Sequence, residues 1–220
     1  MNRPEHGIDP ADKARALALT PVSRETKQRL ESYVELLLEA QAKFNLIAPS
    51  TIPIIWTRHI ADSLQLIDLA PDAKTWVDFG SGAGFPGIPM ACALADKAGV
   101  KVHLVESVGK KANFLREVVQ KLGIPAQVHQ IRAENFGDSF GDKVDVVTAR
   151  AVSPLKVLCD RSFHWIERGA VGIFPKGQDV DAELTEAAKY WIIEANKVLS
   201  KTSPDSKIVV VAGLKPRSRR

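Results

Sequence analysis

The sequence has only two cysteines, Cys92 and Cys159, and it lacks any Cys-x-x-Cys pair. Two thiols so far apart in a 220-residue chain exclude a disulfide framework and a cysteine zinc site, and we expect no metal site. Both cysteines fall in predicted helices and are interpreted as core residues. Because so few cysteines are typical of a reducing compartment, a cytoplasmic location is expected.

Long apolar runs are also lacking. No run approaches 18 apolar residues, and the first residues do not form the hydrophobic segment of a signal peptide. We therefore expect neither a membrane span nor secretion. Internal repeats and low-complexity segments are absent as well. Hydrophobic residues make up 45% and charged residues 25%, ordinary values for a globular domain with a real core, and the length suits one domain with an appendage.

The net charge of +4 is mildly basic. Such a charge permits a polyanionic partner without demanding one. Four of the positive charges lie in the last six residues, KPRSRR. We interpret residues 214–220 as a basic, solvated tail.

Helical periodicity dominates the first 70 residues. Asp9-Pro10 reads as an N-cap followed by a proline at the first helical position. Apolar residues between 30 and 44 recur at helical spacing and predict a longer helix that ends near residue 45. A loop containing two prolines should follow up to residue 53, and a third helical segment is expected over about 54–69. Residues 1–70 are thus predicted to form a helical cap.

Beyond residue 70, short apolar and β-branched segments alternate with helical ones. The expected strands are residues 75–79, 101–106, 126–131, 144–149 and 170–175. The clearest helix between them covers 107–122 and stops at Gly123. This alternation predicts a parallel sheet covered by helices on both faces.

The C-terminal part predicts a hairpin. Segments 191–199 and 207–212 flank the turn-forming sequence KTSPDS, so an antiparallel hairpin should close the sheet. The fold class is therefore α/β, with a doubly wound, mostly parallel seven-stranded sheet over residues 71–213.

A glycine-rich loop, DFGSGAGFPGIP, follows the first expected strand. Its literal G-x-G-x-x-G pattern comprises Gly82, Gly84 and Gly87. Such loops bind phosphates, dinucleotides or S-adenosylmethionine, and the pattern alone does not separate these ligands. A P-loop is excluded because no Gly-Lys-Ser/Thr follows the turn.

Neighbouring residues favour S-adenosylmethionine over a dinucleotide. Pro86 and Pro89 remove two N–H donors that a pyrophosphate would require. Asp78 would repel a pyrophosphate, but its carboxylate suits a ligand that carries an ammonium and a sulfonium. A nicotinamide-dependent dehydrogenase remains a distant alternative.

Three further strand ends supply candidate ligand contacts. Glu106 ends the second strand, where an acid can accept hydrogen bonds from both ribose hydroxyls; the alternative is a cap on the following helix. Ala133 and Glu134 follow the third strand, at the edge where an adenine would lie. Arg150 follows the fourth and can hold a carboxylate or stack on a base. The alternative for Arg150 is a salt bridge to Asp78 or Glu134.

The motifs DFGSGAGFPGIP, ESVGKKANFL, RAENF and ARAVSPL resemble those of the RsmG family, also called glucose-inhibited division protein B. The segments KFNLIAPST, RHIADSL and PKG (175–177) resemble further signatures of that family, over about residues 25–212. The resemblance implies a Rossmann-like class I methyltransferase that uses S-adenosylmethionine. It also implies methylation of a guanine N7 in a decoding-region loop of 16S ribosomal RNA.

The cofactor residues predicted from the loop and from the resemblance are Asp78, Gly80, Gly82, Gly84, Phe85, Glu106, Ser107, Ala133, Glu134 and Arg150. Candidate RNA contacts are Arg58, His59, Lys110, Lys111, Arg116, Lys176 and Lys207. Each of the RNA contacts has a structural or solvated alternative. Lys207 departs from the family pattern, where arginine is expected, so a bidentate phosphate contact becomes a point-charge contact. Asp62 and Ser63 are interpreted as fixing the cap against the main domain.

Methylation at N7 suits this residue inventory. Guanine N7 has a free lone pair and no proton at pH 7, so the enzyme must orient the reactants and needs no general base. Arg150 is the catalytic candidate, in a role other than that of a base. The partner is expected to be 16S RNA or the small subunit, with the target base in a loop or extruded, and the protein a monomer. The alternatives are a related methyltransferase with another substrate and a noncatalytic RNA-binding module.

Overall fold

The computed structural model describes residues 7–150 and 153–217, apart from the side chains of residues 138 and 139. Two residues of the ARAVSPL motif (151–152) and the last three residues of the basic tail lie outside the described residues. None of the described helices combines the length and the apolar character needed to cross a membrane.

The described residues up to Leu69 form helices joined by short turns, as predicted, but the individual helices differ from the prediction. They are α1 (Pro10–Leu19), α2 (Arg24–Gln41), η1 (Pro49–Ile54), the π-helix η2 (Trp56–Ala61), α3 (Asp62–Leu64) and η3 (Ile67–Leu69). The predicted N-cap is confirmed, since the Asp9 carboxylate accepts a hydrogen bond from the Ala11 N–H. The expected single helix over 54–69 is instead a π, an α and a 3-10 turn in succession.

Helix α2 ends at Gln41, earlier than the apolar periodicity predicts. The side chain of Gln41 explains the early end. Its Oε1 accepts hydrogen bonds from the N–H groups of Leu46 and Ile47, at 2.7 and 3.0 Å. These two backbone donors of the turn after the helix are thereby paired. The predicted proline-containing loop then forms the 3-10 helix η1, with Pro49 at its first position.

The seven-stranded sheet has the order β3-β2-β1-β4-β5-β7-β6. The strands are β1 (Thr75–Phe79), β2 (Lys101–Val105), β3 (Ala126–His129), β4 (Val146–Ala149), β5 (Val171–Lys176), β6 (Trp191–Leu199) and β7 (Lys207–Pro216). Strands β1 to β5 are parallel, and β7 runs antiparallel to both β5 and β6. The predicted fold class and the C-terminal hairpin are thereby confirmed, although β7 continues to Pro216, into the predicted tail.

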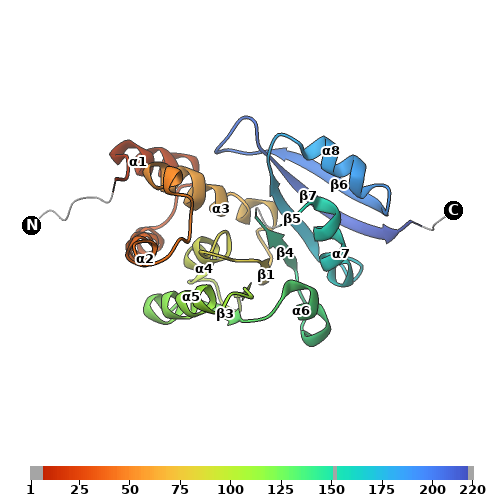
Figure 1. Ribbon diagram of the computed structural model, residues 1–220, viewed down its shortest axis with the longest axis horizontal. Coiled ribbons are helices and arrows are strands. Elements are labelled where there is room, and N and C mark those ends of the chain that lie inside the picture. The colour runs from red at the N-terminus through yellow and green to blue at the C-terminus, as the bar shows by residue number, and fades with distance from the viewer. Residues whose placement is uncertain (1–6, 151–152, 218–220) are drawn as a thin grey trace, which may run out of the picture.

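Helices cover both faces of the sheet (Figure 1). They are α4 (Gly87–Leu94), α5 (Gly109–Leu122), α6 (Ala133–Ser139), α7 (Leu155–Ile166) and α8 (Val180–Ala187). The cap helices pack with α4 and α5 on one face, and α6, α7 and α8 lie on the other. Strand residues alternate between the two cores, so Trp76 belongs to the first and Val77 to the second.

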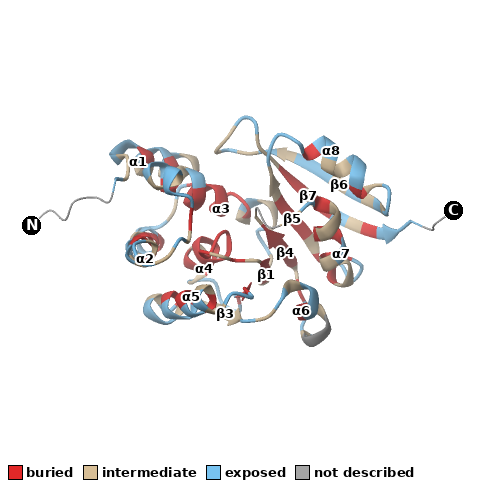
Figure 2. Cartoon of the chain, in the orientation of Figure 1, coloured by how far each residue is buried: buried red, intermediate tan, exposed pale blue. Residues whose placement is uncertain are grey.

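Burial is strongest in the central strands and in α3 and α4, which separate the outer helices (Figure 2). The cap and the sheet share one hydrophobic core, in which Tyr33 of α2 and Met90 of α4 are fully buried. The strand order reverses between β1 and β4. In an open α/β sheet, ligands bind beyond the carboxyl ends of the strands at such a reversal, which directs attention to the residues that follow β1 and β4.

Candidate functional site

The glycine loop leaves β1 and turns back into α4. Gly80, Gly82 and Gly84 all have positive φ, so the turn uses backbone conformations that other residues rarely adopt. Gly87 serves a different purpose, because a Cβ placed there would lie 2.2 Å from Leu104 Cδ2 and 2.9 Å from Asp78 Oδ2. The missing side chain at Gly87 therefore lets α4 approach the strands.

Asp78 lies completely buried beneath this loop. Its Oδ2 accepts a hydrogen bond from the Gly87 N–H at 3.2 Å, whereas Oδ1 has no partner among the described residues. Burial raises the pKa of this carboxyl group to about 7. An orphaned buried carboxylate oxygen fits a cofactor that brings a cationic group, as S-adenosylmethionine does.

Glu106 connects the end of β2 to the glycine loop. One carboxylate oxygen accepts from the Gly82 N–H at 2.9 Å and the other from the Val108 N–H at 2.7 Å. The bond to Val108, just before α5, agrees with the alternative that Glu106 caps this helix. Both oxygens keep lone pairs that can accept ribose hydroxyls, so the cofactor role and the cap are compatible. Ser107, also predicted to contact the cofactor, is exposed beside it.

The edge beyond β3, where an adenine is predicted to lie, contains a residue that sequence reasoning missed. Ala133 and Glu134 follow β3, as predicted, and they open the helix α6. Glu134 forms an ion pair with Arg161 of α7, and Arg161 also donates to Ser153 Oγ at 3.0 Å. A local backbone hydrogen bond, together with the charge of Arg161, lowers the pKa of the Glu134 carboxyl. An arginine inside a helical pattern gives no sequence signal for this pairing, which only the fold creates.

Arg150 turns toward the cap. It forms an ion pair with Asp62 of α3 at 3.2 Å, and both side chains are largely buried. The same guanidinium donates to the Arg58 carbonyl at 3.0 Å and to His59 Nδ1 at 2.6 Å. The salt bridge considered for Arg150 thus exists, but its partner is neither Asp78 nor Glu134. Since Asp62 lies in the cap, this ion pair joins the cap to the main domain, as expected of Asp62, whereas Ser63 bonds to the His59 carbonyl within the cap.

The ring of Phe85 joins the glycine loop to this cluster. The guanidinium carbon of Arg150 lies 5.1 Å from the ring centroid, and the His59 ring stacks on Phe85 at 4.7 Å. Tyr33 meets the same ring edge-on at 5.5 Å. The predicted cofactor residue Phe85 therefore has its side chain packed among cap residues and Arg150.

His59 is a buried, neutral imidazole. Burial and the neighbouring charges of Arg150 and Arg58 lower its pKa to about 3. Because a guanidinium only donates, Nδ1 accepts from Arg150, and the protonated Nε2 donates to Thr51 Oγ1 at 2.9 Å. Both ring nitrogens of His59 are thus engaged within the protein, which agrees with the structural alternative for this residue, and its RNA contact stays a prediction.

An open pocket of about 690 Å³ lies beyond the ends of β4 and β5, next to this cluster. It brings together four of the predicted RNA contacts and the catalytic candidate: Arg58, His59, Lys176, Lys207 and Arg150. Three carboxylates also line it: Asp62, Asp179 and Glu183. The described residues contain no group of three or more His, Cys, Asp or Glu side chains placed to bind a metal ion.

The two lysines of this pocket differ in how firmly their side chains are held by neighbouring residues. Lys176 and Lys207 face each other across the β5–β7 pair. Lys176 is held at 2.7 Å from Glu183 and donates to the Ser153 carbonyl at 2.8 Å. Among the described residues, the only charge partner of Lys207 is Asp181, at the longer distance of 3.8 Å, and the Lys207 side chain is more exposed. Lys207 is therefore the lysine with more freedom to meet a polyanion.

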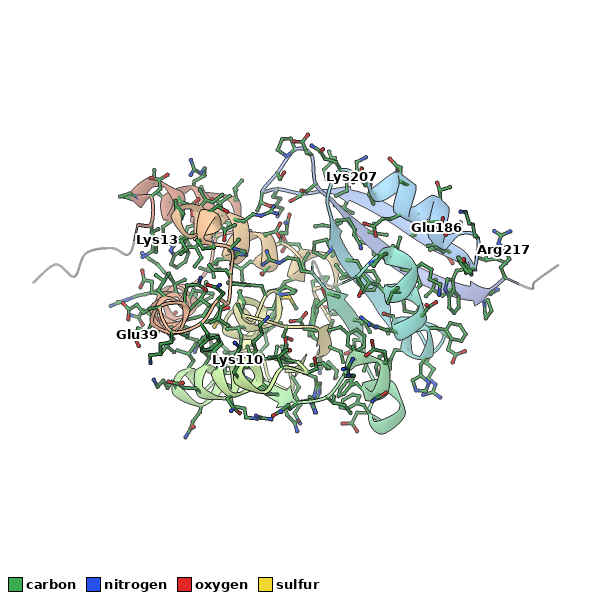
Figure 3. All side chains as sticks on the ribbon, viewed as in Figure 1. Lys13, Glu39, Lys110, Glu186, Lys207 and Arg217 are labelled. Atoms are coloured by element: carbon green, nitrogen blue, oxygen red, sulfur yellow. The ribbon has the colours of Figure 1, made fainter. Side chains whose placement is uncertain are left out.

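The remaining predicted RNA contacts lie elsewhere. Lys110 sits over the ring of Phe44, 5.5 Å from its centroid, in a groove between α2 and α5. Figure 3 shows Lys110 well apart from Lys207. Lys111 is the next residue of α5, and Arg116 bonds to Asn113 and Gln130. The fold thus divides the predicted basic contacts between two surfaces.

Two solved structures share this fold. An O-methyltransferase from Bacillus cereus in complex with SAH has a TM-score of 0.62 at 16% identity, over 94% of this chain and 99% of that one. A mutant of MtNAS in complex with S-adenosylmethionine has a TM-score of 0.55 at 17% identity, over 95% of this chain and 87% of that one. At such identities, the similarity shows the fold alone.

Sequence relatives are far more similar. A protein from Bradyrhizobium sp. (strain BTAi1), named ribosomal RNA small subunit methyltransferase G, is 58% identical over 91% of this chain and 90% of its own length. A protein of the same name from Nitrobacter hamburgensis is 52% identical over 100% of this chain and 85% of its own. The family model GidB, described as rRNA small subunit methyltransferase G, matches residues 26–209. The chain therefore belongs to the GidB family of methyltransferases, as its motifs predict.

Proposed function

We propose that this protein transfers a methyl group from S-adenosylmethionine to N7 of a guanine in a decoding-region loop of 16S ribosomal RNA. Its relatives are named for the RNA of the small ribosomal subunit, which supports RNA as the substrate. Residues 71–213, with the rest of β7, would bind the cofactor, the cap of residues 1–70 would complete the RNA pocket, and the basic tail would begin only after Pro216. In this proposal the protein acts in the cytoplasm as a monomer.

The observation that carries the proposal is the contact between the basic pocket and the glycine loop. Arg150 lines the pocket, and its guanidinium lies over the ring of Phe85, within the loop. A base that entered the pocket would therefore lie beside the loop that binds the cofactor. The basic side chains of Arg58 and Lys207 at the same pocket suit the phosphates of the flanking nucleotides.

The chemistry of the site agrees with an acceptor that has no proton to lose. Bound S-adenosylmethionine supplies a methyl group on a positively charged sulfur. The imidazole in the pocket, His59, is neutral, and both of its nitrogens are engaged in hydrogen bonds, so it is not poised to remove a proton. Guanine N7 needs no such base, and orientation alone can contribute several kcal/mol, up to about 7–11 in ideal cases.

The cofactor residues are proposed from the same geometry. Asp78 would face a cationic group of the cofactor through its orphaned oxygen, and Glu106 would accept the ribose hydroxyls. Ala133 and Glu134 would border the adenine. Arg150 would orient the target base by stacking or hydrogen bonding, since it keeps its proton and cannot act as a base.

The test is methylation of defined RNA substrates. The purified protein is incubated with isotopically labelled S-adenosylmethionine and either naked 16S RNA or small subunits that lack the modification, and the methylated nucleotide is identified by mass spectrometry of nuclease fragments. We expect label on N7 of one loop guanine. Label on another atom or nucleotide would contradict the assignment. RNA binding without label would favour the noncatalytic RNA-binding module.

A further inference from the structure

Tyr33 of α2 reaches from the cap into the glycine loop. Its apolar spacing assigns it to the core face of the helix, and it is fully buried there. Its hydroxyl donates a hydrogen bond to the carbonyl oxygen of Ala83 at 2.7 Å. Ala83 lies between Gly82 and Gly84, in the middle of the turn. A helix of the cap thus bonds directly to the backbone that is expected to bind the cofactor.

Core packing alone does not explain the hydroxyl. A phenylalanine would fill the same space without burying a polar group, and burial of a hydroxyl is costly unless it is hydrogen-bonded. Burial also raises the pKa of the Tyr33 phenol well above its ordinary value, so the group remains a donor. The hydroxyl therefore has one evident structural effect, which is to hold the Ala83 carbonyl.

That carbonyl belongs to the part of the loop with the most restricted geometry. Gly84 has φ +107°, and a Cβ there would lie 2.5 Å from Ile88 Cγ1 and 3.0 Å from the Tyr33 hydroxyl oxygen. The adjacent N–H groups of Gly82 and Gly84 are bonded to Glu106 and to the Ser81 carbonyl. The Ala83 N–H has no partner among the described residues, so it is the donor of this turn that remains for a ligand.

Helix α2 is well placed to hold the loop in position. Arg29 of α2 pairs with both carboxylate oxygens of Asp96, just after α4, at 2.8 and 2.9 Å. The Tyr33 ring also packs edge-on against Phe85, two residues beyond Ala83. Since α2 is tied to the turn and to the far end of α4, the segment from the loop through α4 is fixed at both ends.

We propose that Tyr33 is a positioning residue for S-adenosylmethionine: its hydroxyl holds the Ala83 carbonyl and thereby limits rotation about the backbone of Ala83, so that the N–H of the same residue, in the preceding peptide group, is kept in the direction in which it would donate to the cofactor. The inference rests on the proposed function, because it requires the cofactor to lie on the glycine loop. It assigns the helical cap a part in cofactor binding as well as in RNA binding.

The test compares two tyrosine-to-phenylalanine variants of the full chain. Tyr33→Phe keeps the ring and removes the bond to Ala83, while Tyr190→Phe changes the other tyrosine, which is exposed and whose hydroxyl has no described partner. Isothermal calorimetry should show that S-adenosylmethionine binds Tyr33→Phe roughly five- to tenfold more weakly than wild type. The Tyr190→Phe variant should bind like wild type. In assays, KM for the cofactor should rise while KM for RNA stays constant.

Three outcomes decide the matter. Equal cofactor affinity in wild type and Tyr33→Phe overturns the proposal. So does a loss of affinity that disappears when binding is measured at a temperature ten degrees lower, because the hydroxyl then supports only the fold. Selective loss at both temperatures supports it. If wild type itself binds no S-adenosylmethionine, the proposed function fails first, which distinguishes the two failures.

Discussion

The two halves of the sheet edge present different chemistry. At the ends of β1 and β2 the chain offers backbone groups of the glycine loop and two buried carboxylates, Asp78 within β1 and Glu106 just after β2. Beyond β4 and β5, and at the start of β7, it offers basic side chains that line the pocket, among them Arg150, which bonds to the cap, and Lys207. Phe85 is the point at which the two halves touch.

This difference matches the demands of two kinds of ligand. A small cofactor of fixed shape is best held by rigid backbone, because its position decides the direction of transfer. An RNA segment is long and charged, so side-chain cations at a pocket rim suit it. If the two halves bind these two ligands, substitutions in the first half should lower the affinity for the cofactor. Substitutions in the second half should lower the stability of the contact with the cap and the affinity for RNA.

The largest effect is expected for Arg150→Ala. The change removes the ion pair and leaves Asp62 as an uncompensated, largely buried charge, which typically costs about 3–5 kcal/mol. Methyl transfer should also fall at least tenfold. A purely catalytic Arg150 would be lost with little effect on stability, whereas the pairing with Asp62 predicts a large effect. Urea unfolding and single-turnover rates at saturating cofactor measure the two effects.

Arg58→Ala is the matched control, because Arg58 is an exposed neighbour that takes part in the cluster through its backbone carbonyl. It should unfold like wild type. An Arg150→Ala protein as stable as this control would show that the buried pair does not hold the cap.

The next effect is expected for Glu106→Gln. The carboxamide keeps the shape but loses charge and one acceptor, so S-adenosylmethionine should bind about 1.5–3 kcal/mol more weakly. Glu117→Gln, on the exposed face of α5, is the control. Calorimetry with both proteins is decisive: equal affinities would remove Glu106 from the cofactor site.

A smaller, pH-dependent effect is expected for His59. Its pKa is about 3 in the folded protein and about 6.5 when unfolded, so between these values only the unfolded chain takes up the proton. The free energy of unfolding should therefore fall as the pH drops below 6.5, by at most about 1.4 kcal/mol per pH unit from this group.

Comparison with His59→Asn isolates that contribution. His103, whose pKa burial also lowers, to about 4, remains in both proteins. The variant should be less stable at pH 7 but lose less stability between pH 6 and 4, as measured by urea unfolding at each pH. Parallel curves for the two proteins would show that His59 is not held neutral.

The smallest effect is expected for Lys207→Ala. Loss of one phosphate contact should weaken RNA binding only a few-fold, and it should reduce the slope of log K against log salt by about 0.7. Lys110→Ala is the comparison on the other surface (Figure 3). A larger change in salt slope for Lys110 than for Lys207 would place the RNA on the α2–α5 side.

Local patterns account for most of the fold. The β-branched segments give the five parallel strands, and Gly123 ends α5 in the left-handed conformation, as predicted. The family match confirms the methyltransferase class and S-adenosylmethionine as cofactor. Both could be predicted from the sequence because the combination of motifs is more specific than the glycine loop alone. The π-helix at 56–61 escaped prediction, since the periodicity argument assumes an ideal α-helix.

The missing parts of the candidate site are tertiary contacts. Asp62 and Arg150 are 88 residues apart, and Arg161 reaches Glu134 across 27 residues. Nothing in the spacing of these residues indicates that they meet. Strand ends could be assigned to one edge because topology dictates it, whereas the partners of long side chains depend on how helices pack.

The shared core of cap and sheet has a consequence for synthesis of the chain. Helix α2 is complete at Gln41, but its packing partners α4 and α5 end only at Leu94 and Leu122. At a synthesis rate of roughly 5–20 residues per second, α5 is complete on the order of ten seconds after α2. During this time the apolar face of α2 lacks its packing partner. The nascent chain therefore exposes Leu30 and Leu37 during that interval, and the cap becomes stable only after the first half of the sheet exists.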